Sequence, residues 1–197
     1  MGPMKAQATR QHIVDAADRL FYEHGFEATS FAHIAEAVGL SRGNFYYHFR
    51  TKDEILAAVI AQRMAKTRQM LDAWQEDGSP AARIASFIGI LTTNRTKIML
   101  YGCPVGTLCN ELAKLDHAAR SDAAAIFTLF RTWLAAEFTR MGRPEEADTL
   151  ALHILMRSQG IAALATAFRD EAFVEREIAD MTGWLERQHP DHSPHPA

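Results

Sequence analysis

Residues 25–54 read GFEATSFAHIAEAVGLSRGNFYYHFRTKDE, and this stretch sets two short helical patterns on either side of a glycine turn. The first pattern follows a Thr-Ser pair, either member of which could cap a helix. Gly39 then turns the chain, and Ser41 caps a second short helix that extends to about Phe49. A helix, a glycine-containing turn and a second helix form the helix-turn-helix arrangement, in which the second helix enters the major groove of DNA.

The second short helix carries side chains suited to a DNA contact. Arg42 stands at its start and could bond O6 and N7 of a guanine bidentately, and Gly43 allows a close approach of the backbone. Phe45 and Phe49 are four residues apart and should face the core. The aromatic residues could also serve packing alone. The side chains left for other faces, several of them suited to phosphate oxygens, are Asn44, Tyr46, Tyr47 and His48.

The order of residues from Ile13 to Ile60 closely resembles the TetR family of transcriptional regulators. The resemblance rests on GFEATS at 25–30, VGLSRGNFYYHF at 38–49 and KDEIL at 52–56. It implies a homodimer whose two recognition helices read a palindromic operator on double-stranded DNA. It also implies that a small-molecule effector, or another signal, in the C-terminal part releases the DNA.

The same resemblance assigns roles to individual residues by position. Phosphate contacts fall to Thr29, Ser41, Tyr47, His48 and Lys52. The residues nearest the bases are Arg42, Gly43 and Tyr46, while Asn44 fits either role. Ser30, beside Thr29, completes the predicted DNA-binding set. Lys52 also begins the next helix, where its charge and the helix dipole would both favour a phosphate.

Helical periodicity continues through the rest of the chain, and strand signals are weak, so we expect an all-α fold. The segment Thr51–Glu54 forms a capping box, in which Glu54 reaches back to the N-cap of a long helix that ends near Asp77. Ser79 and Pro80 suit the N-cap and first position of the next helix. Gly142-Arg143-Pro144 likewise predicts the end of one long helix, over about 120–141, and the start of another, over about 145–169.

These patterns predict an N-terminal helix-turn-helix, three-helix DNA-binding domain over 1–52. They also predict a C-terminal helical effector-binding and dimerisation domain over 53–188, followed by a disordered tail over 189–197. The last long helix carries small residues that would allow close contact with a second copy, although they also suit the core of a monomer: Ser158, Gly160, Ala162, Ala163 and Ala165. Homodimerisation therefore rests mainly on the resemblance.

Gly102-Cys103-Pro104-Val105-Gly106 is the most informative C-terminal motif. Pro104 suits the first position of a helix, which puts Cys103 at the N-cap, where the helix dipole favours the thiolate. The motif resembles a TetR subgroup with Gly-Cys at this place, some members of which respond to electrophiles or oxidants. An unreactive cysteine at a helix start is the alternative. Cys109 is expected in the core.

The effector site is otherwise hard to locate in the sequence. Apolar and aromatic residues at helical spacing could line it, or could be ordinary core. With Cys103, the candidates are Phe87, Leu91, Tyr101, Phe127, Phe130, Trp133 and Met156.

The composition excludes several classes of protein. The chain has 197 residues and a formal net charge of −3, and residues 1–52 hold six basic and five acidic side chains. This balance argues against a protein that coats nucleic acid by bulk charge. We find no nucleophile elbow, phosphate loop or His-Glu metal motif, so we expect no enzyme, catalytic residue, cofactor or metal site.

No apolar run suits a membrane span, and no secretory segment is evident, so we expect a cytoplasmic protein with no membrane partner. A helical adaptor that binds protein without binding DNA is the rival of another class.

Overall fold

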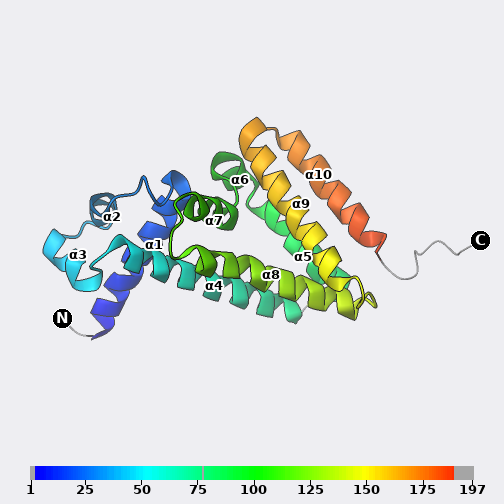
Figure 1. Ribbon diagram of the computed structural model, residues 1–197, viewed down its shortest axis with the longest axis horizontal. Coiled ribbons are helices and arrows are strands. Elements are labelled where there is room, and N and C mark those ends of the chain that lie inside the picture. The colour runs from blue at the N-terminus through cyan, green and yellow to red at the C-terminus, as the bar shows by residue number, and fades with distance from the viewer. Residues whose placement is uncertain (1–2, 77, 189–197) are drawn as a thin grey trace, which may run out of the picture. The chain divides into compact units, whose positions relative to one another are not determined.

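The computed structural model describes residues 3–76 and 78–188, in which every regular element is a helix (Figure 1). The all-α prediction is confirmed. The predicted tail over 189–197 lies outside the described residues. The helices are α1 (Pro3–His24), α2 (Phe31–Ala37), α3 (Arg42–His48), α4 (Lys52–Gln75), α5 (Pro80–Thr93), α6 (Arg95–Tyr101), α7 (Pro104–Lys114), α8 (Arg120–Arg140), α9 (Ala147–Phe168) and α10 (Glu171–Glu186).

Contacts divide the chain into two compact units. The first unit comprises Met1–Lys66 and Thr107–Ala124, and the second comprises Thr67–Gly106 and Ala125–Ala197. The contacts do not divide the chain after residue 52, because the first part of α4 and most of α7 pack with α1, α2 and α3. The division into a DNA-binding and an effector-binding part by function stays a prediction.

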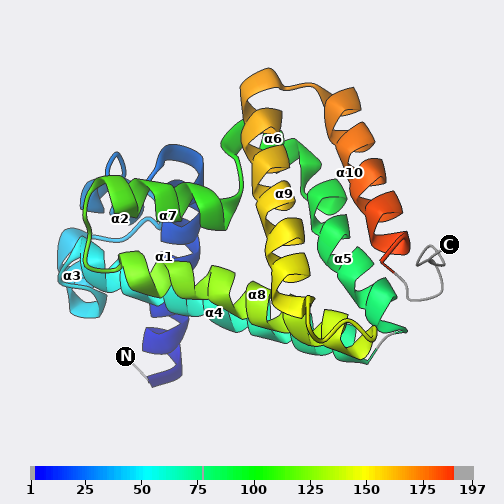
Figure 2. The same ribbon diagram turned by 45° about the vertical axis from the view of Figure 1, so that its right-hand side comes forward.

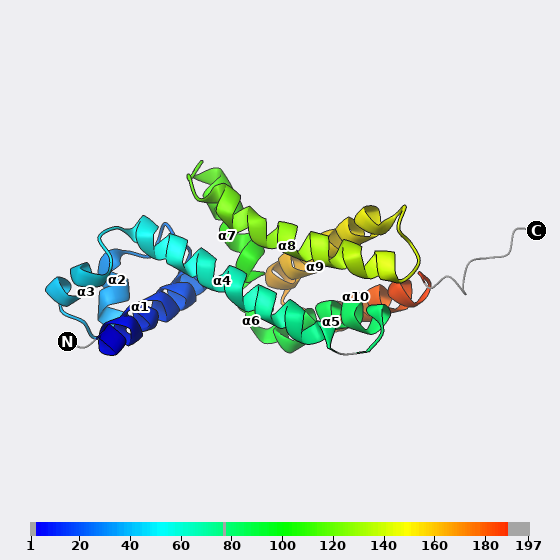
Figure 3. The ribbon, with the colours of Figure 1, turned by 90° about the horizontal axis from the view of Figure 1, so that it is seen from below.

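The first unit is built around an apolar core to which α1, α2, α3, α4 and α7 all contribute. Figure 3 shows α2 and α3 beside α1 and the start of α4. Gly25 and Gly39 end α1 and α2 with φ angles of +92° and +63°, as their sequence positions indicate. Phe45 and Phe49 are buried, as predicted. Other members of this core are Ile13, Ala17, Phe21, Phe26, Ile34, Ile55, Leu56, Leu108 and Leu112.

In the second unit, α5, α9 and α10 lie side by side, and α6 packs against α9 (Figure 2). One face of α9 is buried there, including Leu150, Ile154, Ile161 and Ala165. By length and mean hydropathy α9 could cross a membrane, contrary to our expectation that no segment could. Its buried face identifies it as a core helix, since such helices have the same composition.

The observed N-termini of α4 and α5 can be compared with the caps predicted from the sequence. Ser79 caps α5 by accepting the N–H of Ala82 at 3.2 Å, as predicted. The Thr51 hydroxyl accepts the N–H of Glu54 at 3.1 Å, but the Glu54 carboxylate accepts the N–H of Arg50 at 2.7 Å, one residue before the N-cap.

Helix α9, predicted to begin at about residue 145 after the start signal of Pro144, begins two residues later. Residues 144–146 form turns, and α9 begins at Ala147. The Arg143 guanidinium holds this turn by donating to the Glu146 carboxylate and, at 3.1 Å, to the carbonyl of Gln188. The contact with residue 188 is one that the local sequence could not indicate.

A buried carboxylate ties together the helices of the second unit. Glu137 of α8 is 0% exposed. Its Oε2 accepts a hydrogen bond from Arg83 of α5 at 3.0 Å, and its Oε1 accepts from Gln75 of α4 at 2.8 Å and from Arg140. Arg83 also donates to the carbonyl of Gly78 at 3.0 Å. One charged group therefore links α8 to α4, α5 and the turn between them.

We expect Glu137→Ala to lower the free energy of unfolding by about 3–5 kcal/mol, because it removes the buried carboxylate that pairs with the largely buried Arg83 guanidinium. Chemical denaturation followed by circular dichroism measures this. Arg120→Ala, which removes an exposed ion pair with Asp116, is the control and should cost less than about 1 kcal/mol. Equal losses in the two variants would contradict the role given to Glu137.

Candidate nucleic-acid interface

The recognition helix α3 is held from its inner face and leaves its outer face open. Ser41 caps it by accepting the N–H of Asn44 at 3.5 Å. On the inner face, the Phe45 ring meets the Phe31 ring edge-on, with centroids 4.8 Å apart. A Cβ atom placed on Gly43 would meet nothing within 4 Å. The fold therefore does not require glycine at this position, and the space beside it is open.

Two tyrosines stand on the open face of α3. Tyr46 is 53% exposed and Tyr47 is 76% exposed, which is unusual for large aromatic side chains. The Tyr46 ring stacks on the Phe31 ring at a centroid distance of 5.2 Å, and this contact restrains the position of the Tyr46 hydroxyl. The Tyr47 ring meets the half-buried His48 ring edge-on at 5.1 Å. The side chain of Arg42, predicted to contact a base, lies outside the described part of the structure.

The structure does not support a phosphate contact by Thr29. Its side chain is 1% exposed, and its hydroxyl donates to the carbonyls of Gly25 at 2.7 Å and Leu20 at 3.4 Å. Ser30, and not Thr29, caps α2. The Ser30 hydroxyl accepts the N–H of His33 at 3.1 Å, and His33 Nδ1 accepts the N–H of Ser30 at 3.3 Å.

Lys52 also differs from its predicted role as a phosphate ligand. Its Nζ donates to the carbonyls of Phe26 at 2.9 Å and Glu27 at 3.3 Å, and lies 4.2 Å from the centre of the Phe26 ring. The ammonium is thus engaged by the loop between α1 and α2. His48 Nε2, a second predicted phosphate ligand, is shielded from solvent and makes no hydrogen bond within the described residues.

Sequence reasoning missed Glu111 of α7. Its two carboxylate oxygens accept the N–H groups of Phe26 and Glu27, both at 2.9 Å. No local signal could have indicated this, because the partners are 84 and 85 residues apart in the chain. Glu111 and Lys52 therefore meet the same loop.

The predicted effector residues fall in the second unit with unequal burial. Phe87, Leu91 and Phe130 are buried, and the rings of Phe87 and Phe130 are 5.3 Å apart. The half-buried residues are Tyr101, Phe127 and Trp133. Met156 is 65% exposed, so it does not belong to the buried aromatic cluster of this unit, and its role in effector binding stays a prediction. It lies on the exposed face of α9.

Cys103 stands at the N-cap of α7, as Pro104 predicted. Its Sγ accepts the N–H of Gly106 at 3.4 Å, and its side chain is half-buried. A Cβ atom on Gly106 would meet the amide oxygen of Gln159, the end of a flexible side chain that would have to move.

Two family models match the chain. Residues 13–59 match bacterial regulatory proteins of the tetR family. Residues 80–179 match the C-terminal domain of LmrA/YxaF-like transcriptional regulators. The second match covers about half of the chain and contains most of the second unit.

Relatives and solved structures agree with these matches. The chain is 29% identical over 167 residues to an uncharacterized HTH-type transcriptional regulator in the lacX 3' region of Lactococcus lactis, covering 82% of this chain and 85% of the relative. It is 46% identical over 55 residues to the HTH-type transcriptional regulator AcrR of Shigella flexneri, covering 28% and 26%.

A TetR transcriptional regulator of Legionella pneumophila shares the fold, with a TM-score of 0.79, 24% identity and coverage of 96% and 98%. The reduced form of NemR of Escherichia coli shares it with a TM-score of 0.77, 18% identity and coverage of 89% and 96%.

Proposed function

Since the chain belongs to the TetR family of transcriptional regulators, we propose that it is a homodimeric repressor that binds a palindromic operator and is released by a small apolar or electrophilic effector. The family consists of DNA-binding regulators and not of enzymes. The observation that carries the proposal is the open face of α3, where two exposed tyrosines lie one turn after a glycine that the fold does not require.

On this face we assign Arg42, Gly43 and Tyr46 to the bases. We assign Ser41, Tyr47 and Asn44 to the phosphates, since hydroxyl and amide groups donate well to phosphate oxygens. Ser30 stays in the second set as an exposed cap of α2. The assignment omits Thr29, whose hydroxyl is already used inside the loop.

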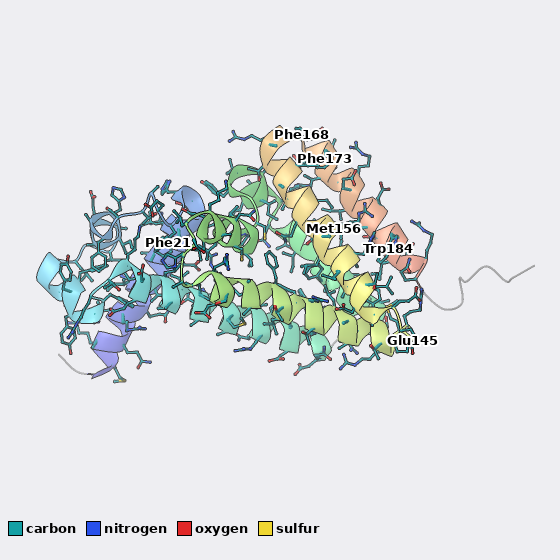
Figure 4. All side chains as sticks on the ribbon, in the orientation of Figure 1. Phe21, Glu145, Met156, Phe168, Phe173 and Trp184 are labelled. Atoms are coloured by element: carbon teal, nitrogen blue, oxygen red, sulfur yellow. The ribbon has the colours of Figure 1, made fainter. Side chains whose placement is uncertain are left out.

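The exposed face of α9 supports the homodimer. Apolar residues recur on it every fourth position, together with a glycine: Leu152, Met156, Gly160, Leu164 and Phe168. Figure 4 labels Met156 and Phe168 on this helix. A continuous apolar line is costly in water and marks a contact surface. A second copy fits it, because a two-fold contact requires a surface that is complementary to itself.

Aromatic residues of the second unit support a site for an apolar effector. The rings of Trp74 and Trp133 are 5.6 Å apart, and Phe87 and Phe130 pair in the same unit. Trp133 Nε1 is shielded from solvent and makes no hydrogen bond within the described residues. A shielded donor among aromatic rings can orient a ligand that carries one acceptor.

A second candidate is a sensor of oxidants or electrophiles that acts through Cys103. The observation in its favour is the N–H of Gly106, which points at the sulfur and would stabilise negative charge on it. A helical adaptor without DNA binding is the remaining alternative, and a test of DNA binding distinguishes it from the regulator.

We expect Arg42→Ala to weaken operator binding by about 1–3 kcal/mol, the value of a bidentate guanine contact. The operator is the duplex that the wild-type chain selects from a random library, and fluorescence anisotropy at fixed salt measures the affinity. Arg19→Ala on α1 removes the same charge from an exposed ion pair and is the control. Equal effects of the two substitutions would refute the base contact. Failure to select any duplex would favour the adaptor.

For the dimer, we expect Met156→Glu to yield monomers in analytical ultracentrifugation at concentrations where the wild-type chain is dimeric. A charge placed in the middle of an apolar contact would have to be buried without a partner. Ala179→Glu, at an exposed position of α10, is the matched control and should leave the mass unchanged. A dimeric Met156→Glu variant would place the interface elsewhere.

If Cys103 is a sensor, N-ethylmaleimide should modify it faster than Cys109 near neutral pH, because its sulfur accepts a backbone N–H at a helix start. Mass spectrometry of timed digests measures both rates. Cys103→Ser should then lose release from DNA by the electrophile, while Cys109→Ser retains it. Equal rates, with a normal response of Cys103→Ser, would leave only the non-covalent effector.

A further inference from the structure

The loop between α1 and α2 is held by charges on both sides of its backbone. On one side, the N–H groups of Phe26 and Glu27 each donate to one oxygen of the Glu111 carboxylate at 2.9 Å. On the other side, the carbonyls of the same two residues accept from Lys52 Nζ at 2.9 and 3.3 Å. We call this set, Glu111 and Lys52 with the backbone of 26–27, the loop clip.

The two charges of the loop clip favour the same orientation of the backbone. N–H groups are attracted by a carboxylate and carbonyl groups by an ammonium, and hydrogen bonds to charged groups are about twice as strong as neutral ones. Gly25 makes room for this arrangement. A Cβ atom there would lie 3.0 Å from Glu111 Oε1, and its φ of +92° is a conformation that glycine adopts most easily.

The backbone of the loop clip directly precedes α2 in the chain, and α2 is followed by α3. The Phe26 side chain is buried, and its ring meets those of Phe21 at 5.3 Å and His117 at 5.2 Å. Three residues later, Thr29 bonds back to the carbonyl of Gly25, and α2 begins after Ser30. The position of the loop therefore determines where α2 starts, and α3 follows α2 after a short turn.

Glu111 itself is held firmly. It lies on α7 beside Leu112 and one turn after Leu108, and both leucines are buried in the core of the first unit. From this geometry we propose that Glu111 is a positioning residue for DNA recognition: with Lys52 it holds the loop between α1 and α2, and so sets the position of α2 and α3 on DNA. The inference rests on the proposed function, in that it concerns the binding of an operator.

Glu111→Gln tests the proposal because two effects of the substitution change operator affinity in opposite directions. Loss of the positioning contact weakens binding, whereas loss of a negative charge alone tightens it. The amide keeps the size of the side chain but can accept only one of the two N–H groups without turning a donor toward the other. We expect operator affinity about tenfold weaker, the usual effect of losing one charge-assisted hydrogen bond. Loss of a negative charge by itself would tighten binding to DNA. Asn110→Ala, at the neighbouring position of α7, should leave the affinity unchanged.

Hydrogen exchange of the free protein gives a second measurement that needs no DNA. In Glu111→Gln we expect the amides of Phe26 and Glu27 to exchange about tenfold faster, with α9 amides unchanged. Unchanged or tighter operator binding would overturn the proposal. So would faster exchange throughout the first unit with unchanged affinity of the folded protein, because that result describes a general stabilising role.

Lys52→Met provides a second variant, which retains the aliphatic stem and removes the ammonium. We expect weaker operator binding with an unchanged dependence on salt, because the ammonium bonds the loop and not DNA. Removal of a phosphate ligand would instead lower the salt slope by about 0.9 for each phosphate that is no longer neutralised, and that result would overturn the role of Lys52 in the loop clip. Selection of no duplex by the wild-type chain would overturn the proposed function, whereas selection with unaltered Glu111→Gln affinity would overturn this inference alone.

Discussion

The DNA-reading end of this protein depends on the burial of two phenylalanines. The recognition helix α3 has seven residues, and a helix of that length has little stability by itself in water. It persists because Phe45 and Phe49 lie in a core formed with α1, α4 and α7. The inner face of α3 packs in this core, whereas its outer face is largely exposed, although Tyr46 stacks on Phe31. The exposed Tyr46 and Tyr47 and the open space at Gly43 lie on the surface that this arrangement leaves available.

This arrangement also suits the modest charge of the DNA-binding part. Residues 1–52 carry only one more basic than acidic side chain, so bulk attraction to phosphate is weak. The structure reduces it further, because Lys52 is engaged by the carbonyls of the loop between α1 and α2. Binding must then depend on the placement of a few groups and, in the proposed dimer, on the spacing of its two copies. A regulator of this kind needs its recognition helices held accurately, and charged contacts to the loop backbone are one means of holding them.

Features that depend on residues close together in the chain were predicted correctly from the sequence. Contacts between residues far apart in the chain were not. The all-α fold, the inward phenylalanines and the caps at Ser41 and Ser79 follow from spacing within a few residues, and each is confirmed. The family followed from the resemblance of residues 13–60 to a known pattern, and it is confirmed as well. Thr29 and Lys52 were given phosphate contacts from their positions in a motif. Their structural partners depend on how the loop folds back, which spacing does not report. Glu111 belongs to the motif that resembles the Gly-Cys subgroup, but nothing in the sequence indicated its contact with a loop more than eighty residues earlier.

Helix α9 shows why composition alone cannot assign a role to an apolar helix. Its length and mean hydropathy are compatible with a membrane span, and its aromatic and methionine residues are compatible with a pocket lining. The structure separates two faces. One is buried against α5, α6 and α10, while the other presents Leu152, Met156, Leu164 and Phe168 to solvent. A helix that is apolar on both faces needs a partner on each. Within residues 3–76 and 78–188 only the first face is covered, and in the proposed dimer the apolar line of a second copy of α9 would cover the other.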